Sequence, residues 1–171
     1  MTTAVCFVCT GNICRSPMAA VVLRQLAAGT VLADGTVLAD HLDVTSAGTS
    51  GWHDGDRMDP RATDVLAAHG YADDGHVAAK VDDSRLARLD LVVSLARQHD
   101  QTLRGIARRH GVGEERFVLL RSFDPSAGGS VDVPDPYYGD DEDFVRCFRI
   151  VEAGCRGLAA ALVERVGAGR P

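Results

Sequence analysis

A cysteine and an arginine near the start of the chain have a spacing that could support phosphate chemistry. They lie in VCTGNICRSP (8–17), where five residues separate Cys9 from Arg15 and Ser16 follows directly. Five intervening residues allow a loop to curl so that its backbone N–H groups point inward. Such a nest at the start of a helix binds a tetrahedral anion. Arg15 can hold two anion oxygens with its planar guanidinium, so the spacing predicts a phosphate-binding loop.

The same loop favours a reactive thiolate at Cys9. Inward N–H groups and the helix dipole stabilise negative charge on sulfur, and sites of this kind lower a cysteine pKa to roughly 3.5–7.5. A thiolate beneath a bound phosphoryl group is placed for in-line attack. Ser16 can donate a hydrogen bond to that sulfur, and we expect Gly11 to take a positive φ at the tight bend. Cys9 is therefore predicted to be a nucleophile.

A general acid is also needed when phosphate is transferred from an ester oxygen. The segment DVPDPYYG (132–139) offers Asp135, which lies between two prolines and is followed by two tyrosines. An isolated Asp-Pro pair is typical of a surface turn. The presence of the Cys9–Arg15 loop favours the catalytic interpretation of Asp135 over the turn.

The two motifs together, VCTGNICRSP and DPYYG, resemble the low-molecular-weight protein tyrosine phosphatases. The resemblance covers nearly the whole chain. It implies hydrolysis of phosphotyrosine and small aryl phosphates through a phosphocysteine, without a metal or cofactor. Cys9 would be the nucleophile and Arg15 the phosphate clamp, while Asp135 would protonate the leaving phenol and then activate water.

The resemblance also implies roles for residues around the loop. The phosphate-binding loop would include Thr10, Gly11, Asn12, Ile13, Cys14 and Ser16. Asn12 would hold the strained turn through hydrogen bonds to Ser46 and His76. For His76 the alternative, a simple loop histidine, stays open.

Aromatic residues near both motifs could form a substrate pocket. The resemblance suggests that Trp52, Tyr137 and Tyr138 stack against a phenyl ring, and aromatic walls favour such a ring. The alternative for Trp52 is a partly buried aromatic without a binding role. In the family the paired tyrosines can be phosphorylated, so a tyrosine kinase is a further expected partner.

The other cysteines raise alternative functions. In the family a second loop cysteine can form a protective disulfide with the nucleophile, which is one interpretation of Cys14; burial as a small apolar residue is the other. Cys6 and Cys9 form a C-x-x-C, but residues i and i+3 of a strand face opposite sides, which argues against zinc or redox pairing. An arsenate reductase on the same fold would need a later cysteine relay, and the chain has only Cys147 and Cys155 after the loop.

The elements that must position these residues follow an alternating pattern. We expect strands at 4–9, 43–48, 89–95 and 116–120. We expect helices after Ser16 as cap and Pro17, at 59–70, at 97–110 and in an apolar stripe formed by Phe144, Phe148, Val151, Cys155, Leu158 and Leu162. This order predicts one α/β domain over 1–171: a four-stranded parallel sheet with helices on both faces. The repeat TVLADGTVLAD (30–40) is interpreted as a lengthened connection.

Composition limits the partners. The chain has 171 residues and a formal net charge of -6, so no basic field attracts nucleic acid. The start lacks the features of a signal peptide and no apolar run could span a membrane. We therefore expect a cytoplasmic monomer whose partners are phosphotyrosine proteins, although export without a signal peptide stays open. Besides an arsenate reductase, a non-catalytic phosphotyrosine-binding module is the second alternative to an active phosphatase.

Overall fold

A computed structural model describes residues 2–168 and contains the expected parallel sheet. Its strands are β1 (Thr3–Cys9), β2 (Leu42–Gly48), β3 (Leu91–Ser94) and β4 (Phe117–Leu119). They are hydrogen-bonded in the order β2-β1-β3-β4, and every pair is parallel. The predicted four-stranded α/β architecture is confirmed, with β3 and β4 slightly shorter than expected.

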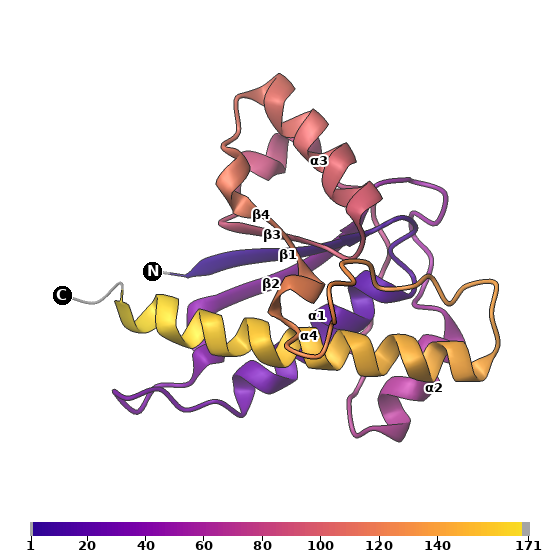
Figure 1. The fold of residues 1–171 in the computed structure, drawn as a ribbon, viewed down its shortest axis with the longest axis horizontal. Helices are drawn as coiled ribbons and strands as arrows, with labels where there is room; N and C mark the ends of the chain where they lie inside the picture. The colour runs from indigo at the N-terminus through magenta and orange to yellow at the C-terminus, as the bar shows by residue number, and fades with distance from the viewer. Residues whose placement is uncertain (1, 169–171) are drawn as a thin grey trace.

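Helices cover both faces of this sheet (Figure 1). The α-helices are α1 (Arg15–Ala28), α2 (Pro60–Ala68), α3 (Arg97–His110) and α4 (Asp141–Ala168). Short 3-10 helices are η1 (Leu38–His41), η2 (Asp83–Arg88), η3 (Glu114–Arg116) and η4 (Leu120–Phe123). Figure 1 shows α3 above the sheet and α4, with α2, below it. The helix expected at 59–70 is shorter, because Asp59 caps it from outside and Gly70 takes a φ of 82° just after it ends.

Two hydrophobic cores lie on opposite sides of the sheet. Successive residues of a strand face opposite sides, so Phe7 and Cys9 of β1 join the larger core beneath α1, α2 and α4. Cys6 and Val8 join the smaller core beneath α3 and η2. The expectation that Cys6 and Cys9 face apart is therefore confirmed.

The long helix α4 supports the segment that leads to Asp135. Its apolar stripe is buried as predicted, from Phe144 to Leu162. Gly157 allows a close approach, because a Cβ there would collide with the Phe123 carbonyl of η4. The chain after η4 is thus held against α4 before it turns toward the strand ends.

The repeat TVLADGTVLAD forms a small hairpin. Val31 and Val37 make an antiparallel bridge, and Gly35 takes a φ of 85° at the turn. Each copy contributes one buried leucine, Leu32 and Leu38. The interpretation as a connection between the first helix and the second strand is confirmed.

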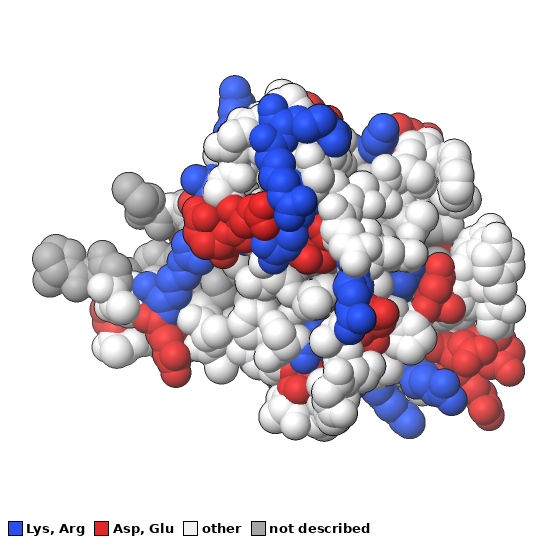
Figure 2. Space-filling model, turned by 45° about the horizontal axis from the view of Figure 1, so that its top comes forward, with Lys and Arg blue, Asp and Glu red and all other residues white. Residues whose placement is uncertain are grey.

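Charged side chains are unevenly distributed over the face drawn in Figure 2. Acidic side chains gather at the end of the molecule where α4 begins, and its first turn contains Asp141, Glu142 and Asp143. Basic side chains (Lys and Arg) lie beside acidic ones over the upper part of this face. Within residues 2–168, no helix is both long enough and apolar enough to cross a membrane.

Candidate active site

Cys9 ends β1, and the loop that follows it leads directly into α1. The Cys9 Sγ lies 3.0 Å from the Ser16 Oγ. The helix begins at Arg15 with Cys14 as its N-cap residue, and no side chain caps it. The prediction that Ser16 is the cap is therefore wrong, because its hydroxyl pairs with Cys9 and Asn12 instead. Uncapped first-turn amides are suited to an anion.

Asn12 supports the loop from within. It is buried and has a φ of 57°. Its Nδ2 donates to the Oγ atoms of Ser16 and Ser46 at 2.8 and 2.9 Å. Its Oδ1 accepts from the Ala79 N–H at 3.0 Å. The structure therefore brings Asn12, Ser46 and Ser16 together.

His76 also supports this turn. Its Nε2 lies 2.7 Å from the Asn12 carbonyl oxygen. A carbonyl only accepts, so the Nε2 carries the proton. Burial lowers the pKa of His76 despite this hydrogen bond, which favours the neutral ring. The structure thus places His76 against the loop rather than in an unrelated turn.

The bend of the loop differs from the expectation for Gly11. Among the non-glycine residues of 2–168, Asn12 has the positive φ, and Gly11 is not among the positive-φ glycines there. Asparagine tolerates this region better than most residues. A Cβ at Gly11 would lie 2.9 Å from the His53 Cδ2, so a larger residue there would require the His53 ring to move.

Arg15 and Asp135 meet across the mouth of the loop. The Arg15 Nη2 donates to the Asp135 Oδ2 at 3.1 Å, and Nη1 donates to the Val133 carbonyl at 3.1 Å. The other carboxylate oxygen, Oδ1, accepts from the Tyr137 N–H at 3.1 Å. The predicted clamp and the predicted acid therefore belong to one site, although they are far apart in the sequence.

These residues line a pocket of about 260 Å³. Its lining comprises Cys9, Thr10, Gly11, Ile13, Cys14, Arg15, Trp52, His53, Asp135, Tyr137 and Tyr138. Trp52 is 84% exposed and Tyr138 is 94% exposed, so both stand at the rim of the pocket. The rings of Tyr137 and Tyr138 pack edge to face at 4.9 Å. The predicted aromatic residues all reach the pocket.

The thiols of the site differ in their surroundings. Cys14 is buried, and burial followed by the nearby Asp59 carboxylate raises its pKa well above the ordinary value. Cys147 of α4 is buried near Arg15 and Cys9, and burial raises its pKa to about 12. Cys155 is fully buried in the larger core, as expected. Neither Cys14 nor Cys147 is thus a thiolate at neutral pH.

Two residues near the pocket were not predicted from the sequence. His53 lines it beside Trp52. His99 of α3 is 1% exposed, and its Nε2 lies 2.9 Å from the Thr10 Oγ1. Burial, then the Arg15 charge, lower the pKa of His99 to about 4. The signal for His53 was its place beside Trp52 in GWHDGD, whereas nothing local marks His99.

A comparison with protein families identifies a matching family model. Residues 4–168 match the model of the low molecular weight phosphotyrosine protein phosphatases. A low molecular weight protein-tyrosine-phosphatase of Streptomyces coelicolor is 48% identical over 167 residues, which are 97% of this chain and 97% of that relative.

Solved structures show the same fold. A protein tyrosine phosphatase from Entamoeba histolytica aligns with a TM-score of 0.84 and 26% identity, over 96% of this chain and 99% of the other. The YwlE arginine phosphatase aligns with a TM-score of 0.76 and 28% identity, over 94% and 95% of the two chains. That structure is of a cysteine-to-serine mutant with a phosphorylated active-site serine.

Proposed function

This chain belongs to the low molecular weight phosphotyrosine protein phosphatase family, and we propose that it hydrolyses phosphotyrosine through Cys9, Arg15 and Asp135. One observation carries the proposal. Two segments far apart in the sequence bring a cysteine, an arginine and an aspartate to a single pocket of about 260 Å³ with aromatic residues at its rim. A nucleophile, an anion clamp and an acid are the groups that cleavage of a phosphate monoester requires.

The first step forms a phosphocysteine. The Cys9 thiolate attacks phosphorus while the guanidinium of Arg15 and the first-turn amides of α1 hold the phosphoryl oxygens. Asp135 donates its proton to the tyrosyl oxygen as the P–O bond breaks. The YwlE mutant structure carries phosphate on the serine that replaces its cysteine, which supports the same role for Cys9.

The second step releases phosphate. Asp135, now a carboxylate, removes a proton from a water molecule that attacks phosphorus, and the Cys9 thiolate leaves. The Ser16 hydroxyl, 3.0 Å from the sulfur, can donate to that thiolate. Both steps are completed without a metal ion or cofactor, because Arg15 and backbone dipoles supply the positive potential.

The pocket walls favour an aryl phosphate. Trp52, Tyr137 and Tyr138 offer ring faces to the phenyl group, and Ile13 adds an apolar surface. The YwlE relative is described as an arginine phosphatase, so phosphoarginine is the competing substrate class. Its guanidinium is cationic and gains little from Ile13, which is why we propose phosphotyrosine.

Hydrolysis assays test this proposal. We expect release of phosphate from a phosphotyrosine peptide and from para-nitrophenyl phosphate, and much slower release from a matched phosphoarginine peptide. Cys9→Ser should abolish turnover, and Asp135→Asn should lower kcat/KM for the phosphotyrosine peptide by at least about 100-fold.

Four outcomes would contradict it. Full activity of Cys9→Ser would exclude Cys9 as the nucleophile, and unchanged turnover of Asp135→Asn would exclude Asp135 as the acid. Thiol-coupled reduction of arsenate without phosphatase activity would favour an arsenate reductase. Binding of a phosphotyrosine peptide without hydrolysis would favour the non-catalytic binding module.

Three finer points belong to the same proposal. We propose that the protein acts on phosphotyrosine proteins as a monomer in the cytoplasm, where its five free cysteines stay reduced. A tyrosine kinase is a proposed partner, since Tyr138 at the pocket rim is accessible. Incubation with a tyrosine kinase followed by mass spectrometry tests this, and no phosphate on Tyr137 or Tyr138 would contradict it.

A further inference from the structure

The geometry points to Arg61 of α2 as a positioning residue that holds the Asp135 loop in place for catalysis. This inference rests on the proposed function, because it concerns the acid of that reaction. Arg61 lies outside the pocket and touches neither Cys9 nor Asp135. It acts through the backbone of the segment that carries Asp135.

Arg61 binds that segment at two carbonyl groups. Its Nη2 donates to the Tyr137 carbonyl at 3.1 Å, and its Nη1 donates to the Gly139 carbonyl at 3.3 Å. The N–H of the same Tyr137 donates to the Asp135 Oδ1. Arg61 therefore fixes the residue whose amide orients the carboxylate.

The guanidinium is itself held firmly. The two carboxylate oxygens of Asp59 accept from the Arg61 Nε at 3.1 Å and from Nη2 at 2.8 Å. This is a bidentate salt bridge between a carboxylate and a planar guanidinium. The guanidinium carbon lies 4.4 Å from the centre of the Phe144 ring of α4, within the range of a cation–π contact. Burial opposes ionisation of Asp59, but the Arg61 hydrogen bonds outweigh it and keep the Asp59 pKa low.

Asp59 also connects Arg61 to the phosphate-binding loop. Its backbone N–H donates to the Ile13 carbonyl at 2.8 Å. The carboxylate side chain also caps α2 by accepting from the Arg61 N–H at 2.9 Å. Asp59 and Arg61 thus connect the loop that binds phosphate to the loop that carries the acid.

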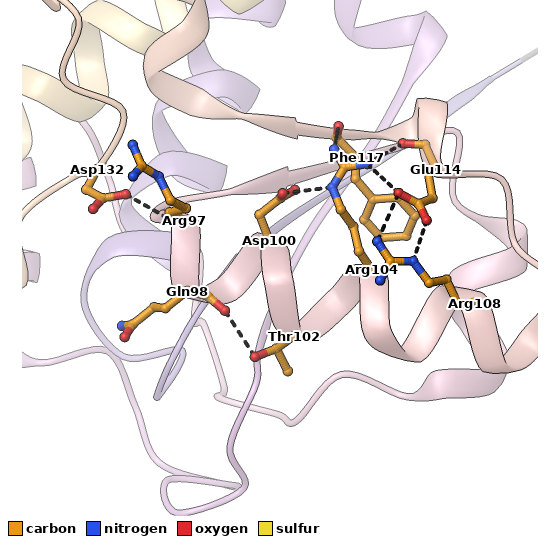
Figure 3. A network of polar contacts seen from close by, with 9 residues as sticks. All are labelled: Arg97, Gln98, Asp100, Thr102, Arg104, Arg108, Glu114, Phe117 and Asp132. Carbon is orange, nitrogen blue, oxygen red and sulfur yellow. Dashed lines mark hydrogen bonds and ion pairs between the residues drawn. The ribbon is translucent and has the colours of Figure 1, made fainter.

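The other side of the acid segment is anchored independently. Figure 3 shows Asp132 at the start of α3, where its Oδ1 accepts from the Arg97 N–H at 2.6 Å. The Val133 N–H donates to the Leu95 carbonyl at 2.8 Å. Asp135 therefore lies between two anchors, and Arg61 supplies the one on the carboxyl side.

A substitution of Arg61 should leave a specific kinetic signature. General acid catalysis matters most when the alcohol is a poor leaving group. The value of kcat/KM reports the step in which that alcohol leaves. A misplaced Asp135 should therefore impair phosphotyrosine strongly and 2,4-dinitrophenyl phosphate, whose phenolate leaves unaided, only slightly. A merely structural defect would lower both equally.

The test compares Arg61→Lys with Asp59→Asn. Lysine at position 61 keeps the positive charge but cannot form the bidentate hydrogen bonds of a guanidinium. Asparagine at position 59 keeps the helix cap but weakens the salt bridge with Arg61. We expect each to lower kcat/KM for phosphotyrosine about 10-fold and for 2,4-dinitrophenyl phosphate less than about 3-fold. Arg156→Lys is the matched control, because Arg156 pairs with Glu152 on α4, away from the pocket. It should behave as the wild type.

The results separate the two proposals. Equal losses for both substrates, or no loss in either variant, would overturn the role of Arg61 while leaving the phosphatase activity intact. If one variant fails to fold, the other still gives the ratio of the two substrates. Absence of activity in the wild-type protein would instead contradict the proposed function.

Discussion

The Arg15 Nη2 lies 3.1 Å from the Asp135 Oδ2, joining a guanidinium that is 4% exposed to a carboxylate that is 48% exposed. The Nη2 atom has two N–H groups, so a phosphoryl oxygen can bind it beside the carboxylate oxygen. The other oxygen of Asp135 accepts from the Tyr137 N–H, which holds the carboxylate independently of Arg15. The predicted phosphate clamp and the predicted acid therefore lie within hydrogen-bond distance of each other.

Replacing Arg15 by lysine should preserve the charge and remove the fork. We expect Arg15→Lys to lower kcat/KM for para-nitrophenyl phosphate by at least about 100-fold, as loss of a preorganised donor does elsewhere. Inhibition by inorganic phosphate should weaken in parallel, since both anions use the same nitrogens. Steady-state kinetics with phosphate as competitor measures both effects. Activity within about threefold of the wild type would show that charge alone is sufficient.

The parts of the site that could be predicted are those with a local signal. The apolar run 4–9 indicates β1, and C-x5-R-S describes a loop whose residues are contiguous. Asp135 could be predicted only because the DPYYG motif that contains it is recognisable in a chain that also has the Cys9–Arg15 loop. The sequence pattern wrongly predicts Ser16 as the helix cap, because the start of the helix depends on how the loop closes around Asn12, which no short-range rule describes.

Asn12 should be the most costly position of the loop for stability. Asn12→Ala removes hydrogen bonds to Ser16, Ser46 and the Ala79 N–H and places alanine at a φ of 57°. We expect the free energy of unfolding to fall by about 3 kcal/mol or more. Ser46→Ala, which removes one of these bonds, should cost about 1 kcal/mol. Urea denaturation at neutral pH measures both, and equal costs would contradict a central role for Asn12.

His99 and Arg61 depend on contacts that the sequence does not encode locally. The segment 97–110 is rich in charged residues, so a histidine in its first turn is expected at the surface. It is buried because α3 packs beside the phosphate-binding loop, where its Nε2 lies within hydrogen-bond distance of the Thr10 Oγ1. Arg61 likewise reaches Tyr137 and Gly139 only after α2 and α4 are packed together.

His99 should make stability depend on pH. Its pKa is about 4 in the folded protein against 6.5 ordinarily. Below pH 6.5 the unfolded chain binds a proton that the folded protein does not, so the stabilisation is present above 6.5 and is lost as the pH falls toward 4. We expect a loss of about 3 kcal/mol over this window.

Urea denaturation at both ends of the window tests the His99 prediction. His99→Gln should reduce the pH dependence by this amount, because the charges of Arg15, Asp135 and Asp132 that act on His99 stay in place. His110→Gln, at the exposed end of α3, is the control. This variant should retain most of the pH dependence of the free energy of unfolding. An unchanged pH dependence in His99→Gln would assign the effect to the carboxylates.

Cys14 should protect Cys9 against peroxide. Hydrogen peroxide oxidises the Cys9 thiolate to a sulfenic acid. The Cys14 sulfur then attacks the Cys9 sulfur, the two sulfurs form a disulfide, and the oxygen leaves as water after Cys14 loses its proton. Because burial raises the Cys14 pKa, the reaction should be faster at higher pH. Activity lost to mild peroxide should return with dithiothreitol in the wild type and only partly in Cys14→Ser.

Mass spectrometry of the tryptic peptide that ends at Arg15 identifies the product. The wild-type peptide should be lighter by two hydrogens, and the Cys14→Ser peptide should accumulate sulfinate at Cys9 instead. A bridge that persists in Cys14→Ser would implicate Cys6, which lies in the same peptide. Cys147→Ser is the matched control, because this buried thiol also lies near Cys9, and it should protect as the wild type does. Equal sulfinate in wild type and Cys14→Ser would contradict the protective role and leave Cys14 as a buried residue of the loop.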